Sequence, residues 1–228
     1  MKLSVVMPVY NEAGTVREVV ARVLAEAHEK EIIIVDDGST DGSRDVLAEI
    51  ASEHNGVVRL VLHEVNRGKG AAIRTGIGHV QGDIVLIQDA DLEYSPDDYG
   101  ALVAPLLEGR TDVVYGSRFL NRDAEFLPAS RAANRFLTLL TNVLYGARLT
   151  DMETCYKVIR TPLAKSLPLR SDAFEIEPEI TAKLLKRGAK IVEVPVQYKA
   201  RGFVQGKKIG WRDGLQAVWT LLRYRFSD

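Results

Sequence analysis

The chain has 228 residues, of which 46% are hydrophobic and 27% charged, and its formal net charge is −1. The near-neutral balance gives no electrostatic reason to expect a nucleic-acid partner, and the single cysteine, Cys155, excludes an internal disulfide and a Cys/His zinc motif. The length suits a single domain over 1–228. Because the start has no signal-peptide pattern and no run reaches about 20 apolar residues, we expect a cytoplasmic protein.

Strands and helices are predicted to alternate through the first half of the chain. Short apolar runs predict strands, and apolar residues at helical spacing predict helices between them. The expected strands are 3–9, 32–35, 57–62, 84–87 and 112–115, and the expected helices are 15–27, 43–52, 71–80 and one that begins at Ser95 and Pro96. The alternation indicates an α/β fold with a mostly parallel sheet and helices on both faces.

The second half of the chain departs from this alternation. It contains an apolar and basic segment, 128–145, and then a polar turn that runs into a short strand, 151–159. A helix at 178–186, a strand at 191–196 and a basic loop at 199–208 follow. The last segment, 211–226, mixes apolar, aromatic and basic residues and is predicted to be an amphipathic helix.

Four of the predicted strands end in polar or glycine-containing loops. In a parallel sheet the carboxyl ends of the strands meet at one edge, where ligands bind. The loops are Tyr10-Asn11-Glu12, Asp36-Asp37-Gly38, Asp89-Ala90-Asp91 and Gly116-Ser117-Arg118. We therefore expect one site where these loops converge.

Three carboxylates follow the buried strand 84–87. In an extended chain Asp89, Asp91 and Glu93 point to the same side, because side chains two residues apart share a face. Such a cluster repels itself unless a cation lies within it, and oxygen ligands suit Mg²⁺ or Mn²⁺. The alternative for any single acidic pair is a strand followed by a solvated turn.

The motifs resemble those of family 2 glycosyltransferases, which have the GT-A (Rossmann-like) fold and use nucleotide-sugar donors. The matching segments are Val6 to Glu12, Val35 to Asp41, Asn66 to Gly70 and Asp89 to Asp91. The later part of the chain is similar to the dolichyl-phosphate mannose synthase and polyprenyl-phosphate glycosyltransferase branch, through Gly116 to Arg118, Asp151 to Lys157, Glu177 to Glu179 and Arg201 to Gly210. One departure is Glu93, where some relatives carry glutamine.

The resemblance implies that the half 1–118 binds a nucleotide-sugar, GDP-mannose or UDP-glucose. Sequence reasoning alone does not separate Asp36 from Asp37 as the base or ribose contact, and the resemblance favours Asp37. The implied donor-binding residues are Pro8, Tyr10, Glu12, Val35, Asp37, Lys69, Asp89, Ala90 and Asp91. Asp89, Asp91 and Glu93 are the implied ligands of Mg²⁺ or Mn²⁺, an ion that neutralises the departing diphosphate.

The resemblance also implies that the half 119–228 binds a polyprenyl phosphate acceptor. A phosphate monoester is already an anion at neutral pH, so it needs a cationic cradle more than a base. The candidates are Arg118, Arg131, Arg201, Lys207 and Lys208. Asp151 occupies the place of the general base in relatives with hydroxyl acceptors; here it either orients the acceptor or caps a turn. Asp91, Arg118 and Asp151 are the expected catalytic residues of an inverting transfer.

A lipid acceptor requires contact with a membrane. The segment 211–226 places Trp211, Leu215 and Trp219 beside arginines, as interfacial helices do. We expect a peripheral protein on the cytoplasmic face of a membrane, with a membrane-anchoring subunit as a further partner. The alternatives are that this helix only packs on the sheet, that the acceptor is a soluble or polysaccharide hydroxyl, or that the chain is a non-catalytic nucleotide-sugar binding module.

Overall fold

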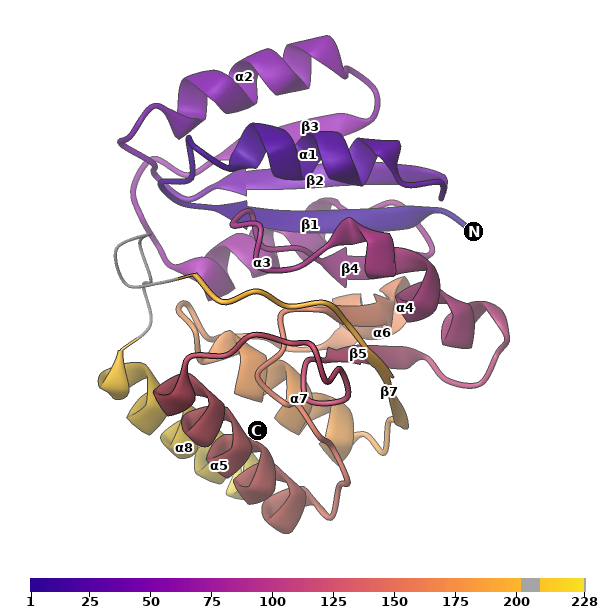
Figure 1. The fold of residues 1–228 in the computed structure, drawn as a ribbon, viewed down its shortest axis with the longest axis vertical. Helices are drawn as coiled ribbons and strands as arrows, with labels where there is room; N and C mark the ends of the chain where they lie inside the picture. Colours follow the sequence, from indigo (N-terminus) through magenta and orange to yellow (C-terminus); the bar gives the residue numbers. More distant parts are fainter. Residues whose placement is uncertain (202–209, 228) are drawn as a thin grey trace.

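The computed structural model describes residues 1–201 and 210–227. Within these residues one seven-stranded sheet forms the centre of the molecule, in the order β3-β2-β1-β4-β6-β5-β7 (Figure 1). The strands are β1 Leu3–Val9, β2 Lys30–Asp36, β3 Val58–Leu62, β4 Ile84–Ile87, β5 Val113–Ser117, β6 Lys157–Arg160 and β7 Ile191–Pro195. All seven strands expected from the sequence are present; 3–9 and 84–87 match β1 and β4 at both ends, and the ends of the others shift by at most six residues.

The sheet is mostly parallel, as expected. β1 pairs in parallel with β2 and β4, β2 with β3, and β5 with β7. β6 is the exception, because it lies between β4 and β5 and runs antiparallel to both. β5 therefore points the same way as β4, and the carboxyl ends of β1, β2, β4 and β5 meet at one edge. This confirms the expected convergence of the four loops.

Helices cover both faces of the sheet. They are α1 Val16–Ala25, α2 Ser43–Glu53, α3 Lys69–His79, η1 Pro96–Asp98, α4 Tyr99–Leu107, α5 Pro128–Tyr145, α6 Thr161–Ser166, α7 Ile176–Lys186 and α8 Trp211–Phe226. α1 and α4 lie in front of the sheet in Figure 1, and α3 and α7 lie behind it. The short helix α6 was not predicted from the sequence.

The core is formed by the inner strands, which are buried on both faces, whereas the edge strands β3 and β7 are mostly half-buried or exposed. All four residues of β4 are buried, as the apolar run predicted. On α3, Gly76 allows close packing on β1, because a Cβ atom there would come within 2.4 Å of Val6 Cγ1. This close packing places the amino end of α3, and with it Lys69, next to the carboxyl end of β4.

α5 and α8 lie side by side at the end of the molecule that also carries α7 (Figure 1). Their inner faces form a second, smaller hydrophobic cluster, which includes Leu137 and Leu221. Their outer faces are apolar too, since Phe136 and Trp219 are more than half exposed. α8 is thus the amphipathic helix that the sequence predicted. Within the described residues, no helix combines the length and the apolar character that crossing a bilayer requires.

Candidate active site

The loops after β1 and β2 are tied together at the converging edge of the sheet. Pro8 and Val35 are partners in the register of β1 and β2, so the two residues expected to shape a base slot are adjacent. The Asn11 backbone N–H donates to Ser39 Oγ at 2.9 Å, and the Thr40 N–H donates to Asn11 Oδ1 at 2.8 Å. Tyr10, at the end of this pair of loops, is half-buried.

Asp37 holds the loop that leads into α3. Its buried carboxylate accepts hydrogen bonds from the backbone N–H groups of Arg67 at 3.0 Å and Gly68 at 2.7 Å. His63 Nδ1 lies 2.7 Å from the same carboxylate. Gly68 has φ +97°, and a Cβ there would collide with the Asp172 carbonyl at 2.3 Å, so the loop requires glycine. A contact of Asp37 with the base stays a prediction, and His63 was not foreseen.

Lys69 contacts the acidic end of β4. Its Nζ lies 2.8 and 2.9 Å from the two Asp89 carboxylate oxygens, and 3.2 Å from Glu177 Oε1. Burial alone would lower the pKa of Lys69, but the negative charge of Asp89 raises it well above its usual value. Conversely, the Lys69 ammonium outweighs burial and lowers the pKa of Asp89. Lys69 and Asp89 are therefore a charged pair.

Asp91 lies in a region that is short of positive charge. Burial, together with the charges of Asp89 and Glu93, raises the pKa of the Asp91 carboxyl to about 7, although Arg201 counteracts the rise. Arg201 Nη2 lies 3.1 Å from Asp91 Oδ2. The same guanidinium binds Glu12 through two hydrogen bonds of 3.0 Å. Arg201, expected beside the acceptor, thus contacts the carboxylates of the donor-side loops.

Glu93 departs from the expected three-carboxylate metal site. Its carboxylate accepts hydrogen bonds from Tyr198 Oη at 3.0 Å and from the Arg201 backbone N–H at 2.8 Å. Across residues 1–201 and 210–227, no three His, Cys, Asp or Glu side chains form a group that could hold a metal ion. The expected three-ligand set is therefore not assembled. Asp89 and Asp91 remain as the carboxylates at the strand end, joined by Ala90, whose carbonyl accepts from Thr15 Oγ1 at 2.7 Å.

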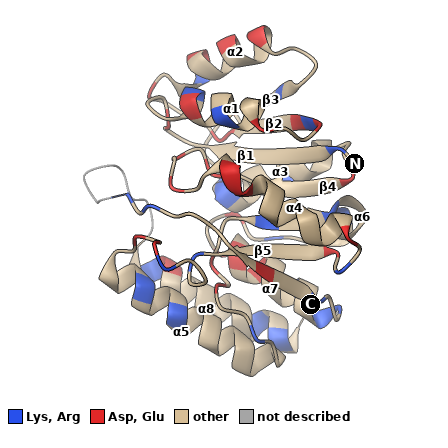
Figure 2. Ribbon diagram, turned by 45° about the vertical axis from the view of Figure 1, so that its right-hand side comes forward, with Lys and Arg blue, Asp and Glu red and all other residues tan. Residues whose placement is uncertain are grey.

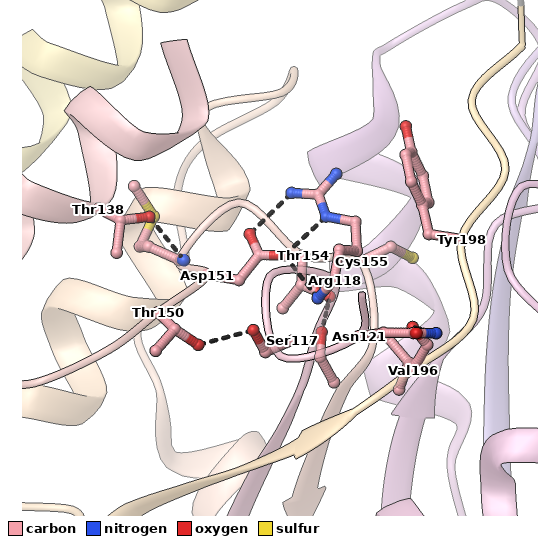
Figure 3. A network of polar contacts seen from close by, with 12 residues as sticks. Ser117, Arg118, Asn121, Thr138, Thr150, Asp151, Thr154, Cys155, Val196 and Tyr198 are labelled. Carbon is pink, nitrogen blue, oxygen red and sulfur yellow. Dashed lines mark hydrogen bonds and ion pairs between the residues drawn. The ribbon is translucent and has the colours of Figure 1, made fainter. Parts of the chain in front are cut away.

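Arg118 and Asp151 form a buried bidentate pair, shown in Figure 3. Arg118 Nε donates to Asp151 Oδ2 at 2.6 Å, and Nη2 donates to Oδ1 at 2.7 Å. The Arg118 backbone N–H adds a third hydrogen bond at 3.0 Å. The Asp151 backbone N–H is in turn held by Glu193 Oε1 at 2.9 Å. Both carboxylate oxygens of Asp151 are thus engaged, which opposes a role as a free base.

Two aromatic rings join the acceptor-side arginines. The Arg118 guanidinium lies 5.0 Å from the centre of the Tyr198 ring and 5.7 Å from that of Phe126, and Arg131 lies 5.7 Å from the Phe126 ring. Because Tyr198 also binds Glu93, it connects this group to the acidic strand end. The sequence did not identify three residues as part of the site: Phe126, Tyr198 and Glu193. For the two aromatic residues, the only signal was an arginine close by in the sequence. Lys207 and Lys208 lie outside the described residues.

Comparisons with known proteins show which family this chain belongs to. The profile of Glycosyl transferase family 2 matches residues 4–167. The chain is 33% identical over 199 residues to glycosyltransferase AglJ of Haloferax volcanii, covering 86% of this chain and 63% of that protein. It is 32% identical over 210 residues to an undecaprenyl-phosphate 4-deoxy-4-formamido-L-arabinose transferase of Salmonella paratyphi A, covering 90% of this chain and 62% of the relative. The chain thus spans less than two thirds of the length of these relatives.

The fold has close counterparts among solved structures. Glucosyl-3-phosphoglycerate synthase from Mycobacterium tuberculosis, crystallised with Mn²⁺, UDP and glucosyl-3-phosphoglycerate, superposes with a TM-score of 0.74 at 23% identity. The match covers 100% of this chain and 81% of that one. This likeness confirms the expected GT-A fold.

Proposed function

Because the chain belongs to glycosyl transferase family 2, we propose that it is an inverting glycosyltransferase that moves a hexose from GDP-mannose or UDP-glucose to a polyprenyl phosphate. The Salmonella relative is named for an undecaprenyl-phosphate acceptor, and UDP is bound in the solved structure of similar fold. Both support a nucleotide-sugar donor and a lipid phosphate acceptor for this chain.

The state of Asp151 is the observation that carries the choice of acceptor. A hydroxyl acceptor needs a base within reach of its proton. Asp151 is fully buried and both of its oxygens bind Arg118. A phosphate acceptor needs no such base, since its second pKa is about 6 and it is already ionised. The locked pair therefore favours the phosphate.

On the donor side, Asp89 and Asp91 fit a divalent cation as a pair rather than as part of a trio. The pKa of Asp91 is raised to about 7 by burial and by neighbouring negative charge, so the strand end favours added positive charge. Carboxylate oxygens are the ligands that Mg²⁺ and Mn²⁺ prefer. When bound there, such an ion would neutralise charge on the departing diphosphate. Lys69, beside Asp89, adds a protein cation at the same place.

On the acceptor side, Arg118 and Arg131 would hold the lipid phosphate through the charge they present around Phe126. A phosphate oxygen then forms the new bond to the anomeric carbon, while the bond from that carbon to the diphosphate oxygen breaks. Attack from the side opposite the leaving group inverts the anomeric configuration. No proton has to be removed in this step, which agrees with the absence of a free base at Asp151.

The exposed face of α5 and α8 is the proposed membrane contact. It presents large apolar residues that are more than half exposed: Phe136, Leu139, Val143, Trp211, Leu215, Trp219 and Phe226. Arginines accompany them on both helices (Figure 2). Aromatic and basic residues on one helix are typical of interfacial binding. This surface would place the protein on the cytoplasmic face of a membrane, where an anchoring subunit is a further proposed partner.

Two substitutions on the acceptor side test this function. Arg118→Ala should lower transfer to polyprenyl phosphate by about 100-fold or more, because a preorganised charge is lost. Asp151→Asn keeps the size of the side chain and one acceptor oxygen but turns an NH2 group toward Arg118; it should cost about tenfold, less than Arg118→Ala, because the Arg118 charge stays and no proton transfer is lost. Both are measured as initial rates of sugar transfer, with circular dichroism as the check on folding.

The second candidate is a family 2 transferase with a hydroxyl acceptor. The solved structure of similar fold carries a soluble acceptor product, glucosyl-3-phosphoglycerate. In that case Asp151→Asn should abolish transfer as completely as the loss of a base does. A third candidate, a nucleotide-sugar binding module, predicts donor binding with no transfer to any acceptor.

A further inference from the structure

A row of alternating charges, half-buried at its donor-side end and buried at its acceptor-side end, connects the two sides of the site. It begins at Asp89, whose carboxylate pairs with Lys69 at 2.8 Å. Lys69 Nζ is also 3.2 Å from Glu177 Oε1. The other oxygen of Glu177, Oε2, binds Lys157 Nζ. The row of four residues, Asp89, Lys69, Glu177 and Lys157, therefore runs from the end of β4 through α3 and α7 to β6.

Lys157 connects this row to the acceptor-side turn. Its side chain is fully buried, and Nζ donates to the carbonyl oxygen of Met152 at 3.1 Å and to that of Thr154. These carbonyls lie in the turn that begins with Asp151, the partner of Arg118. Tyr115 covers the ammonium, with its ring centre 4.9 Å from Nζ. Lys157 thus fixes the turn that holds the Arg118–Asp151 pair.

Glu177 is the only member of the row that contacts both lysines. Its Oε1 is buried and has no hydrogen-bond partner within the described part of the chain. This oxygen therefore acts on Lys69 through charge at 3.2 Å rather than through a directed hydrogen bond. Buried charges are costly unless paired, so the positions of the two lysines depend on the negative charge of Glu177.

We propose that Glu177 is a positioning residue that couples the two halves of the site, because it shares Lys69 with Asp89 and fixes Lys157 under the Asp151 turn. The proposal rests on the proposed function. Without the Glu177 charge, Lys69 binds Asp89 alone and withdraws that carboxylate from a divalent cation. At the same time Lys157 loses the carboxylate that balances its charge, which weakens its hold on the Asp151 turn.

Glu179 provides a matched control on the same helix. It is a fully buried glutamate in the first turn of α7, as Glu177 is, and it too pairs with a lysine, Lys183. Its other contacts include the backbone N–H groups of Arg170 at 2.9 Å and Ser171 at 2.7 Å, and the Tyr224 side chain. None of these residues belongs to the row. Glu179→Gln therefore reports the general effect of breaking a buried glutamate–lysine pair on α7.

The experiment measures Mn²⁺-dependent binding of UDP and GDP by calorimetry, without any acceptor. Glu177→Gln should weaken this binding by about tenfold, the usual effect of losing a residue behind a metal ligand. Glu179→Gln should stay within about twofold of the unchanged protein, even if its melting temperature falls equally. Glu177→Asp, which keeps the charge, should recover part of the loss and serves if the glutamine variant does not fold. Equal weakening by Glu177→Gln and Glu179→Gln, or by neither, overturns the proposal.

Lys157→Met tests whether the effect passes through Glu177. Lys157 does not contact Asp89, yet its removal should weaken Mn²⁺-dependent nucleotide binding by about threefold, and should add nothing in a Glu177→Gln background. Additive effects would contradict the coupling. Because these measurements need no acceptor, a chain that binds nucleotide but transfers no sugar to lipid defeats the proposed function and leaves the role of Glu177 standing. If the chain binds neither UDP nor GDP in the presence of Mn²⁺, both the proposed function and the role of Glu177 are contradicted.

Discussion

The donor side and the acceptor side of the site differ in how their charges are balanced. At the end of β4, negative charge and burial together raise the pKa of Asp91 to about 7. On the acceptor side, Arg118 and Asp151 satisfy each other through two side-chain hydrogen bonds. The donor side is thus prepared to receive a cation, whereas on the acceptor side the cation, Arg118, is already present and is held in a fixed position by Asp151. The two sides should therefore respond differently to the loss of a charge.

The largest expected effect is on the donor side. Asp91→Asn should reduce transfer by about 1000-fold, because a charge that organises the donor diphosphate is lost. The melting temperature should stay constant or rise, since the substitution relieves repulsion from Asp89 and Glu93. Initial rates and thermal melts measure the two quantities. If Asp91→Asn retained most of its activity, the donor side would not depend on this carboxylate.

A smaller effect is expected at the outer face of α8, which serves the acceptor side. Trp211→Glu together with Leu215→Glu should lower binding to anionic vesicles by about tenfold, because apolar burial is replaced by repulsion. Donor binding should not change. Co-sedimentation with vesicles at low salt measures this. Leu62→Glu is the control, since Leu62 is also half exposed but lies at the end of β3, on the opposite side of the sheet. Equal losses in both variants would argue against a dedicated membrane face.

The smallest expected effect concerns Glu153, an acceptor-side residue whose carboxyl group has no ion-pair partner among the described residues. Burial raises its pKa to about 7, against the attraction of Lys157, and its Oε1 has no hydrogen-bond partner among the described residues. The folded state therefore holds a proton that the unfolded state releases near pH 4.5. The stability contributed by this proton is complete below that pH and is lost as the pH rises through about 7.

Glu153→Gln removes this dependence. The variant should melt about 7 °C higher than the unchanged protein at pH 8.5, and the difference should shrink toward zero at pH 4.5. Thermal melts across this range measure it. A difference that is constant with pH would mean that Glu153 ionises normally in the folded protein.

Local patterns in the sequence were enough to predict most of the donor side. The apolar runs of β1, β2 and β4 and the polar residues at their ends are contiguous, so periodicity alone placed Asp37, Asp89 and Asp91 at one edge. The partners of these residues were harder to foresee. Arg201 was assigned to the acceptor because nothing in its local sequence indicates that it folds back on Glu12.

The acceptor side depends on pairs that are far apart in the chain. Glu177 meets Lys157 across 20 residues, and Tyr198 meets Glu93 across 105. The hydrophobic periodicity of a segment does not predict contacts between residues that are far apart in the chain. It therefore could not predict these pairs, nor the antiparallel insertion of β6 between β4 and β5. The one available signal for these pairs was Lys157, a charged residue in a segment predicted to be a strand. A buried lysine requires a negatively charged partner.

Transfer of radiolabelled sugar tests the central claim most directly. The protein is incubated with labelled GDP-mannose or UDP-glucose, a polyprenyl phosphate in detergent, and Mn²⁺ or Mg²⁺, and the label is then partitioned between water and organic solvent. We predict that label from one of the two donors moves into the organic phase, and that it does so only with the metal ion present. Label that reaches a soluble hydroxyl acceptor but no polyprenyl phosphate with either donor would contradict the account.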